Sequence, residues 1–228
     1  MPDRELRLTP EEELVAITVG PLERLDGPVT LVESDPQWPA LFDREAVRIR
    51  QALGDRALMV EHVGSTAVPG LAAKPIIDIA LVVADSGDES AYVPALEAVG
   101  YRLRLRTPDW EEHRMFKGPE TGINLHVFSP ESKEVQRMVS FRDHLRGDAA
   151  DRERYAAEKR RLAVRQWAYM QHYADAKTRV VEAILTRAPP ETRSPLTTGT
   201  ACPRAKSPRD RATGMRNPGA VVAPTARP

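Results

Sequence analysis

The apolar run PIIDIALVV at residues 75–83 is the feature that most constrains the fold. It is nearly continuous and rich in β-branched side chains, a pattern typical of a central strand that is covered on both faces. Asp78 is the one acid inside this run. Because a carboxylate is costly to bury without a partner, we expect Asp78 near the edge of a pocket, where it holds a cation or a Mg²⁺-bound phosphate. The alternative is a structural role, in which Lys74 or backbone N–H groups satisfy the carboxylate.

Strand and helix patterns occur throughout the rest of the body. Apolar residues at helical spacing predict helices over 39–53 and 90–99. Runs of β type predict further strands over 29–32, 57–63, 101–106, 110–116 and 123–128. Residues 132–187 are almost entirely helical in pattern, with breaks expected near Gly147-Asp148 and near His172. The chain therefore predicts a mixed β-sheet with flanking helices and a helical C-terminal half, in the α/β (α+β) class.

Composition divides the chain into three parts. Residues 189–228 are rich in proline and arginine and contain no aromatic side chain. Such a segment cannot bury enough apolar surface to offset the entropy of ordering it, so we expect a disordered tail, either a weak electrostatic arm or a solvated extension. Residues 29–188 are the expected domain. Residues 1–28 are an N-terminal extension, with a short helix that Thr9 caps and Pro10 begins.

Charge and cysteine content exclude several classes of protein. The chain has 33 Lys+Arg against 33 Asp+Glu, which gives no general reason to expect binding to nucleic acid. Cys202 is the single cysteine and excludes an intrachain disulfide. No apolar run approaches the roughly 20 residues that span a bilayer, and the first residues lack the core of a signal peptide. We expect a cytoplasmic protein without a membrane partner, and its oligomeric state stays open.

A stretch with the composition of a phosphate-binding loop precedes the Asp78 strand. Gly64 allows the backbone to turn sharply and approach a ligand. Ser65 and Thr66 supply hydroxyl and N–H groups, and Lys74 adds a positive charge. The spacing differs from that of a Walker A loop, which needs Gly-x4-Gly-Lys-Ser/Thr. We therefore predict a site for a nucleotide or another phosphorylated small molecule at Gly64, Ser65, Thr66 and Lys74.

The segment EHVGSTAVPGLAAKPIIDI at 61–79 resembles the signature of the GrpB-like family, which is assigned to the nucleotidyltransferase superfamily with the DNA polymerase β-like fold. Further family-like pieces follow in order over about residues 29–188. They are Asp35-Pro36 with Trp38, Gly100-Tyr101, NLHVF at 124–128, FRDHLR at 141–146, Tyr155 with Lys159, and Tyr173 with Lys177. The resemblance implies a nucleotidyltransferase-like mixed sheet.

The resemblance also implies an activity. Gly64 and Ser65 would bind the phosphates of an NTP, and Asp78 would be the catalytic metal ligand for Mg²⁺ or Mn²⁺, with a nucleotidyl group transferred to an unknown small molecule. The family pattern places a second carboxylate at position 80 and a third on a later strand. Here these positions offer Ala80, and Asn124 with His126. Two-metal transfer needs several oxygen ligands, and one aspartate cannot supply them.

Two rival functions follow from those missing acids. The first is a catalytically degenerate module that binds a nucleotide or phosphate ligand. Because some members are fused to dephospho-coenzyme A kinase domains, the resemblance links this module to coenzyme A metabolism. The second rival is metal-dependent hydrolysis of a phosphate ester by Asp78 and His126. Fold alone does not choose among these functions.

Several other residues are candidates with open alternatives. His126 is either a metal ligand, alone with Asp78 or together with Glu61 and His62, or a hydrogen-bonding histidine. Strand alternation places Glu61 and His62 on opposite faces, which argues against a shared pocket. Arg142 and Arg146, four residues apart on one helix face, either grip phosphate or form a solvated face. The remaining candidates face the pocket or only brace the fold: His113, Arg114, Asn124, Tyr155, Lys159 and Lys177.

Overall fold

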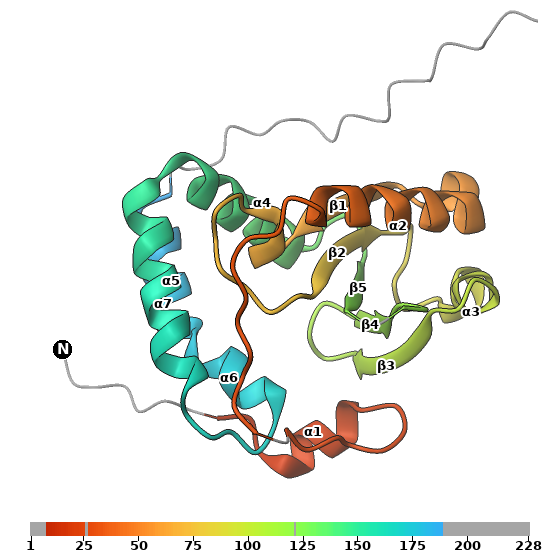
Figure 1. Ribbon diagram of the computed structural model, residues 1–228. Helices are drawn as coiled ribbons and strands as arrows, with labels where there is room; N and C mark the ends of the chain where they lie inside the picture. Colours follow the sequence, from red (N-terminus) through yellow and green to blue (C-terminus); the bar gives the residue numbers. More distant parts are fainter. Residues whose placement is uncertain (1–7, 26, 121, 189–228) are drawn as a thin grey trace, which may run out of the picture. The chain divides into compact units, whose positions relative to one another are not determined.

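The computed structural model describes residues 8–25, 27–120 and 122–188 (Figure 1). The expected tail at 189–228, with Cys202, lies outside the described residues. The strands are β1 (Met59–Val63), β2 (Ile77–Val82), β3 (Arg102–Thr107), β4 (His113–Lys117) and β5 (Ile123–Phe128). The α-helices are α1 (Glu11–Ile17), α2 (Trp38–Leu53), α3 (Val93–Ala98), α4 (Lys133–Gly147), α5 (Ala149–Ala163), α6 (Met170–Ala176) and α7 (Thr178–Leu185). No helix in the described part of the chain is long and apolar enough to cross a membrane.

The five strands form one mixed sheet in the order β1-β2-β5-β4-β3. β2 and β5 are parallel, and the other neighbouring pairs are antiparallel. β2 lies inside the sheet between β1 and β5, as its apolar run predicted. The expected fold class, a mixed sheet with flanking helices and a helical C-terminal half, is confirmed.

One face of the sheet is the main hydrophobic core. Ile79 of β2 and Leu125 of β5 are completely buried there, against Ile49 of α2 and Leu96 of α3. Burying a side chain of this size contributes about 1.5–3 kcal/mol relative to leaving it exposed. Since side chains alternate along a strand, the residues between these apolar positions point to the opposite face.

That opposite face, here called the site face, carries polar side chains at adjacent positions of three strands. Asp78 of β2 lies opposite Asn124 of β5, which lies opposite Lys117 of β4. One row further along the sheet, Ala80 lies opposite His126. At the far end of β2 and β5, Val82 and Phe128 pack against α4, so the helical C-terminal half covers this face. The topology therefore gathers the chemistry-bearing residues beneath those helices.

The C-terminal helices differ in part from the expectation. The break at Asp148 is confirmed, because its carboxylate caps α5 by accepting a hydrogen bond of 2.8 Å from the Asp151 backbone N–H. The next break falls between α5 and α6, and His172 lies within α6. The predicted strand over 29–32 does not form, apart from one bridge between Val32 and Ala73. Val29 is instead buried against the helical half of the molecule.

The N-terminal extension joins the two sides of the fold. α1 lies beside β3, and the Val19 N–H donates to the Arg104 carbonyl at 2.8 Å (Figure 1). On the other side, Leu25 N–H donates to the Ala168 carbonyl at 2.9 Å. Pro10 is the cap residue of α1, so the prediction of a Thr9 cap is wrong. Thr9 instead donates both its backbone N–H and its hydroxyl to Asp175.

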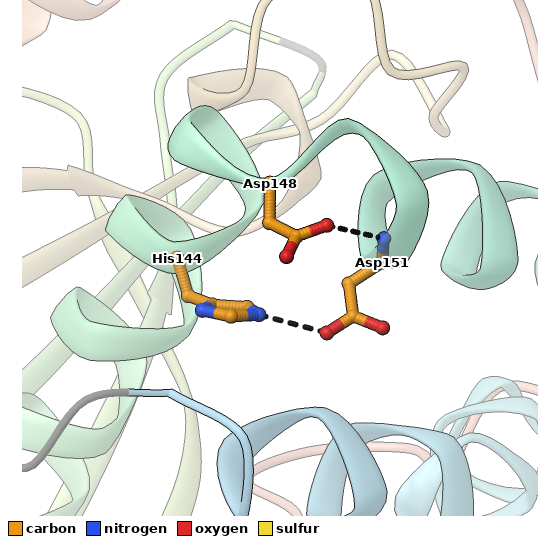
Figure 2. A group of neighbouring side chains, drawn as sticks. All are labelled: His144, Asp148 and Asp151. Carbon is orange, nitrogen blue, oxygen red and sulfur yellow. Dashed lines mark hydrogen bonds and ion pairs between the residues drawn. The ribbon is translucent and has the colours of Figure 1, made fainter.

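Asp151 ties the C-terminal helices together. Its side chain is buried, with 3% of the residue exposed, and its oxygens accept hydrogen bonds from Arg187, Arg154 and His144. Figure 2 shows the ring of His144 pointing at this carboxylate, beside the capping Asp148. The hydrogen bonds from Arg187 and His144 outweigh burial and hold the pKa of Asp151 far below its usual value.

We expect Asp151→Asn to lower the free energy of unfolding by about 2 kcal/mol, because it removes the buried negative charge that faces His144 and two arginines. Asp148→Asn is the matched control, since asparagine caps a helix as well as aspartate does, and it should cost less than about 0.5 kcal/mol. Urea denaturation of both variants measures the difference. Equal losses would show that Asp151 has no special role.

Candidate functional site

A cavity of about 670 Å³ lies between the site face and the helices that cover it. The structure brings nine of the sequence-predicted residues to its wall. They are Gly64, Ser65, Lys74, Asp78, Asn124, His126, Tyr155, Lys159 and Lys177. These residues come from β2, β5, α5, the loop between β1 and β2, and the junction of α6 and α7, and the candidate site is therefore one continuous cavity.

Asp78 lies on the sheet floor of this cavity. Its Oδ1 accepts a hydrogen bond of 2.8 Å from Asn124 Nδ2, and His126 Nε2 lies 3.8 Å from the same oxygen. Burial opposes ionisation of Asp78, but the adjacent His126 ring, the Asn124 amide and the charge of Lys74 outweigh it and lower the pKa of this carboxyl. Asp78 is therefore a carboxylate at neutral pH.

Gly64 lies so close to Asp78 that a side chain at position 64 would collide with the carboxylate. Its φ of +71° and ψ of −170° lie in a region that L-residues with a side chain rarely adopt. A Cβ at this position would lie 2.5 Å from Asp78 Oδ2. The glycine thus lets the loop that leaves β1 pass directly over the carboxylate, and it brings Ser65 into the cavity.

Four lysines converge on this cavity from different elements. Lys159 is buried, Lys74 and Lys177 are half-buried, and Lys117 lies at the exposed rim. Burial and the charges of Lys177 and other neighbouring cations lower the pKa of Lys159 to about 7 and that of Lys74 to about 8. Within the described ranges, none of these four ammonium groups has a carboxylate oxygen within 4.0 Å, the distance limit for an ion pair.

The partners of these lysines carry no charge. Lys74 Nζ contacts the thioether sulfur of Met170 at 3.1 Å, and Lys159 donates to the Ala72 carbonyl. Lys177 lies over the ring of Tyr173, 4.7 Å from its centroid. An ammonium group held by a thioether or a ring retains hydrogen-bond donors for an anion.

Two tyrosines complete this wall of the cavity. The Tyr155 hydroxyl lies near the Ser65 side chain, and burial raises the pKa of Tyr155 to about 12. Tyr173 is 1% exposed, and its hydroxyl has no hydrogen-bond partner in the part of the chain that the structure describes. Because buried polar groups are almost always paired, the Tyr173 hydroxyl indicates a bound water or ligand at this wall.

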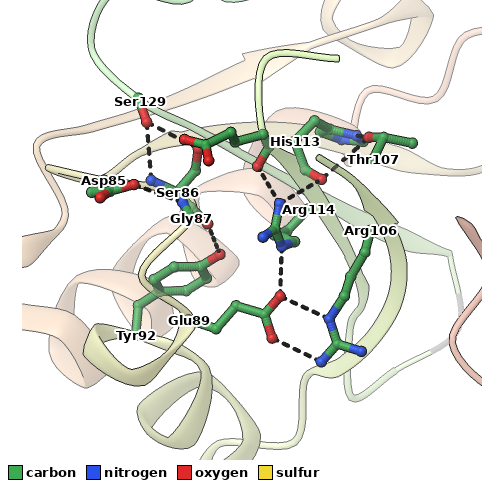
Figure 3. Close-up of polar contacts among 11 residues, drawn as sticks. Asp85, Ser86, Gly87, Glu89, Tyr92, Arg106, Thr107, His113, Arg114 and Ser129 are labelled. Carbon is green, nitrogen blue, oxygen red and sulfur yellow. Dashed lines mark hydrogen bonds and ion pairs between the residues drawn. The ribbon is translucent and has the colours of Figure 1, made fainter. Parts of the chain in front are cut away.

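His113 lies behind His126, outside the cavity wall. Its Nε2 is 3.0 Å from His126 Nδ1. On the other side of the ring, its Nδ1 is 3.0 Å from the Thr107 hydroxyl (Figure 3). Burial and the neighbouring His126 and Arg114 lower the pKa of His113 to about 2, so its ring is neutral. This chain of contacts fixes the His126 ring with Nε2 directed to Asp78.

Arg142 and Arg146 brace the loop that follows β1 and do not line the cavity. Arg142 binds Glu61 at 2.7 Å and the His62 carbonyl at 2.8 Å, at the end of β1. Arg146 donates to the Ala67 carbonyl at 2.9 Å, just after the loop. Both guanidinium groups therefore hold the backbone on either side of Gly64 and Ser65.

The other predicted residues lie outside the cavity as well. His62 stacks on Phe42 and contacts the Thr66 hydroxyl at 3.1 Å, and burial lowers its pKa to about 4. Arg114 binds Glu89 at 2.6 Å, together with Arg106, away from the cavity (Figure 3). The structure thus does not bring Glu61 and His62 into one site with Asp78 and His126.

Sequence reasoning missed Lys117 and the wall that the N-terminal extension provides. Lys117 ends β4, and strand alternation from Met115 could have placed it on the site face. The N-terminal wall has four apolar side chains, Leu14, Ile17, Leu22 and Leu25, beside Thr18, Glu23 and Arg24. No local pattern reveals that wall, because the segment reaches the cavity through distant contacts with β3 and α6.

The residues present do not fit the two-metal centre of the nucleotidyltransferase superfamily. Ala80 supplies no ligand atom, and Asn124 directs its amide nitrogen, not its oxygen, at Asp78. Among residues 8–25, 27–120 and 122–188, the one group of three close acidic or histidine ligands is His144, Asp148 and Asp151. That group is outside the cavity, and arginines occupy the Asp151 oxygens. Mg²⁺ or Mn²⁺ therefore lacks a carboxylate cage beside Asp78.

We expect Gly64→Ala to lower the free energy of unfolding by about 2–4 kcal/mol, the sum of backbone strain and the clash with Asp78. Gly70→Ala is the matched control. Its φ is also positive, +75°, but nothing lies within 4 Å of the added Cβ, so it should cost only about 1 kcal/mol. Thermal unfolding measures both. Equal losses would show that the loop does not press on Asp78.

Comparison with known proteins places the chain among relatives along most of its length. The family model described as "GrpB protein" matches residues 28–187. The chain is 61% identical to UPF0157 protein BH1888 of Halalkalibacterium halodurans, over 78% of this chain and 91% of that protein. It is 48% identical to a dephospho-CoA kinase of Mycolicibacterium paratuberculosis, over only 36% of this chain and 21% of that protein.

A solved structure agrees with the sequence matches. The crystal structure of conserved protein GrpB from Enterococcus faecalis superposes with a TM-score of 0.62 at 30% identity, covering 70% of this chain and 96% of that chain. Together with the family match over residues 28–187, this similarity shows that the chain belongs to the GrpB family.

Proposed function

We propose that this protein binds a phosphorylated small molecule, with a nucleotide as the leading candidate, in the cavity above Asp78. The observation that carries the proposal is the convergence of Lys74, Lys117, Lys159 and Lys177 on that cavity without a carboxylate partner. Mutual repulsion and burial disfavour their charged forms. A bound polyanion stabilises the charged forms of these lysines. This stabilisation contributes to the free energy of binding.

The neutral donors of the cavity support the same ligand chemistry. Ser65 follows the glycine turn and faces the lysines, with Tyr155 beside it. Tyr173, whose hydroxyl has no hydrogen-bond partner among the described residues, has its ring beneath the ammonium group of Lys177. Hydroxyl and ammonium donors around one space suit phosphate oxygens, which accept hydrogen bonds from both. The apolar N-terminal wall would contact the part of the ligand that carries no phosphate.

The partial match to a dephospho-CoA kinase adds coenzyme A precursors to the candidate ligands. These molecules join phosphate groups to a long organic chain, and they agree with a cavity that has a cationic wall and an apolar wall. We place this function in the domain at 29–188, with residues 14–25 as one wall, and in the cytoplasm.

Nucleotidyl transfer is the second candidate, and the position of Asp78 with His126 favours it. An acceptor hydroxyl oxygen would form a bond to the α-phosphorus of a bound NTP while the bond to the pyrophosphate oxygen breaks. The acceptor proton would pass to His126 or Asp78, and pyrophosphate would leave among the lysines. Transfer predicts pyrophosphate release that Asp78→Asn abolishes without abolishing NTP binding.

We expect the melting temperature of the full chain to rise with at least one ligand in a panel of nucleoside triphosphates, pyrophosphate and coenzyme A precursors, because a ligand that binds the folded state stabilises it. Lys177→Met should weaken that binding about tenfold or more, since it removes one charge-assisted contact. Calorimetric titration measures the change.

Lys133→Met is the matched control, because Lys133 is exposed at the start of α4 and does not line the cavity. It should bind like the unmodified protein. A flat panel, or equal weakening by both lysine variants, would contradict the proposed function.

A further inference from the structure

The site face carries a lysine and an amide where the family resemblance implies a carboxylate. Lys117 Nζ donates to Asn124 Oδ1 at 2.7 Å, and Asn124 Nδ2 donates to Asp78 Oδ1 at 2.8 Å. The three residues occupy one row across β4, β5 and β2. Only one orientation of the Asn124 amide satisfies both a cationic donor and a carboxylate acceptor. The row therefore fixes the amide with its oxygen turned away from Asp78.

In this orientation Asn124 offers no oxygen atom to a metal ion beside Asp78. The positive charge nearby is that of Lys117, which binds the amide oxygen. A carboxylate at position 124 would direct oxygen atoms toward a cation beside Asp78, whereas the amide directs N–H groups there. Ala80, completely buried in the next row, adds nothing. Lys74, Lys117 and Lys177 all lie within the electrostatic range of Asp78. The positive charge near Asp78 thus comes from ammonium groups of the chain itself.

We infer that these lysines supply the positive charge that two metal ions would otherwise provide. The cavity therefore binds a free polyphosphate anion and not its complex with a divalent cation. The inference rests on the proposed function. Four ammonium groups supply the same formal charge as two divalent ions. Asp78 repels the ligand only weakly, because Asn124 donates to its Oδ1 and Lys117 in turn donates to the Asn124 amide oxygen. A divalent cation that binds the polyphosphate in solution competes with the lysines for the same oxygen atoms.

Pyrophosphate is the probe that tests this inference, because it is all phosphate and binds Mg²⁺ tightly. We expect calorimetric titration of the full chain to show binding with excess EDTA, and about tenfold weaker apparent binding with excess MgCl₂. Lys117→Met should weaken binding in EDTA about tenfold, and Lys133→Met should leave it unchanged. Lys117 is exposed, so its variant should fold. Lys74→Met provides a second variant of the cluster.

The outcomes separate this inference from the proposed function. Binding in EDTA that weakens with MgCl₂ and with Lys117→Met supports the inference. Binding that requires MgCl₂ overturns the inference and leaves the proposed function standing. Binding in EDTA that neither Lys117→Met nor Lys74→Met changes also overturns it. An absence of binding under both conditions overturns the proposed function and this inference with it.

Asn124→Asp gives an independent check, because it restores an oxygen ligand beside Asp78. We expect this variant to bind pyrophosphate more weakly in EDTA, since two adjacent carboxylates repel the anion. MgCl₂ should then strengthen binding by the variant, the reverse of its effect on the unmodified chain. If MgCl₂ weakens binding by both proteins equally, the Asn124 amide does not control metal use and the inference fails.

Discussion

The carboxylate of Asp78 on the buried strand β2 is the constraint on which the rest of the site depends. A charge on an internal strand is costly unless polar groups surround it. Here Asn124 donates to it, His126 lies beside it, and the lysines balance its charge. Gly64 is required because the loop passes so close to the carboxylate. Asp78 therefore explains the local sequence of the loop, of β5 and of the end of β4.

The two faces of the sheet carry different kinds of side chain, apolar on one and polar on the other. The apolar face buries large aliphatic side chains against α2 and α3 and provides the main hydrophobic core. The site face has its polar residues in adjacent rows, covered by helices from the other half of the chain. Because β2 and β5 are parallel, their polar positions fall in register at the same level of the sheet. This register places Asp78, Asn124 and His126 together although they are far apart in sequence.

Much of the fold could be predicted from the sequence, because its signals are local. The run at 75–83 identified an internal strand, and the Asp148 cap marked a helix break. Four of the predicted cavity residues, Gly64, Ser65, Lys74 and Asp78, also lie in one continuous motif at 61–79. The orientations of Arg142 and Arg146 could not be predicted, since helix spacing does not say which neighbour a guanidinium group meets. Lys117 and the N-terminal wall depend on strand pairing and on contacts between distant segments, which leave no local pattern.

The lysine cluster gives the family's fold a distinct electrostatic character. Where the superfamily pattern implies further acids beside Asp78, this chain has Ala80 and Asn124 there, and four lysines line the same cavity. The free cavity is under electrostatic strain, which burial increases. This strain is a property of the ammonium groups themselves, because it lowers the pKa values of Lys159 and Lys74.

A nuclear magnetic resonance titration of the lysine side chains, with and without saturating pyrophosphate, tests this claim most directly. In the free protein, Lys159 and Lys74 should titrate near pH 7 and pH 8, well below the ordinary lysine value of about 10.4. Pyrophosphate should raise both values, because the bound anion stabilises the protonated form. Ordinary values in the free protein, or values that pyrophosphate leaves unchanged, would contradict the account.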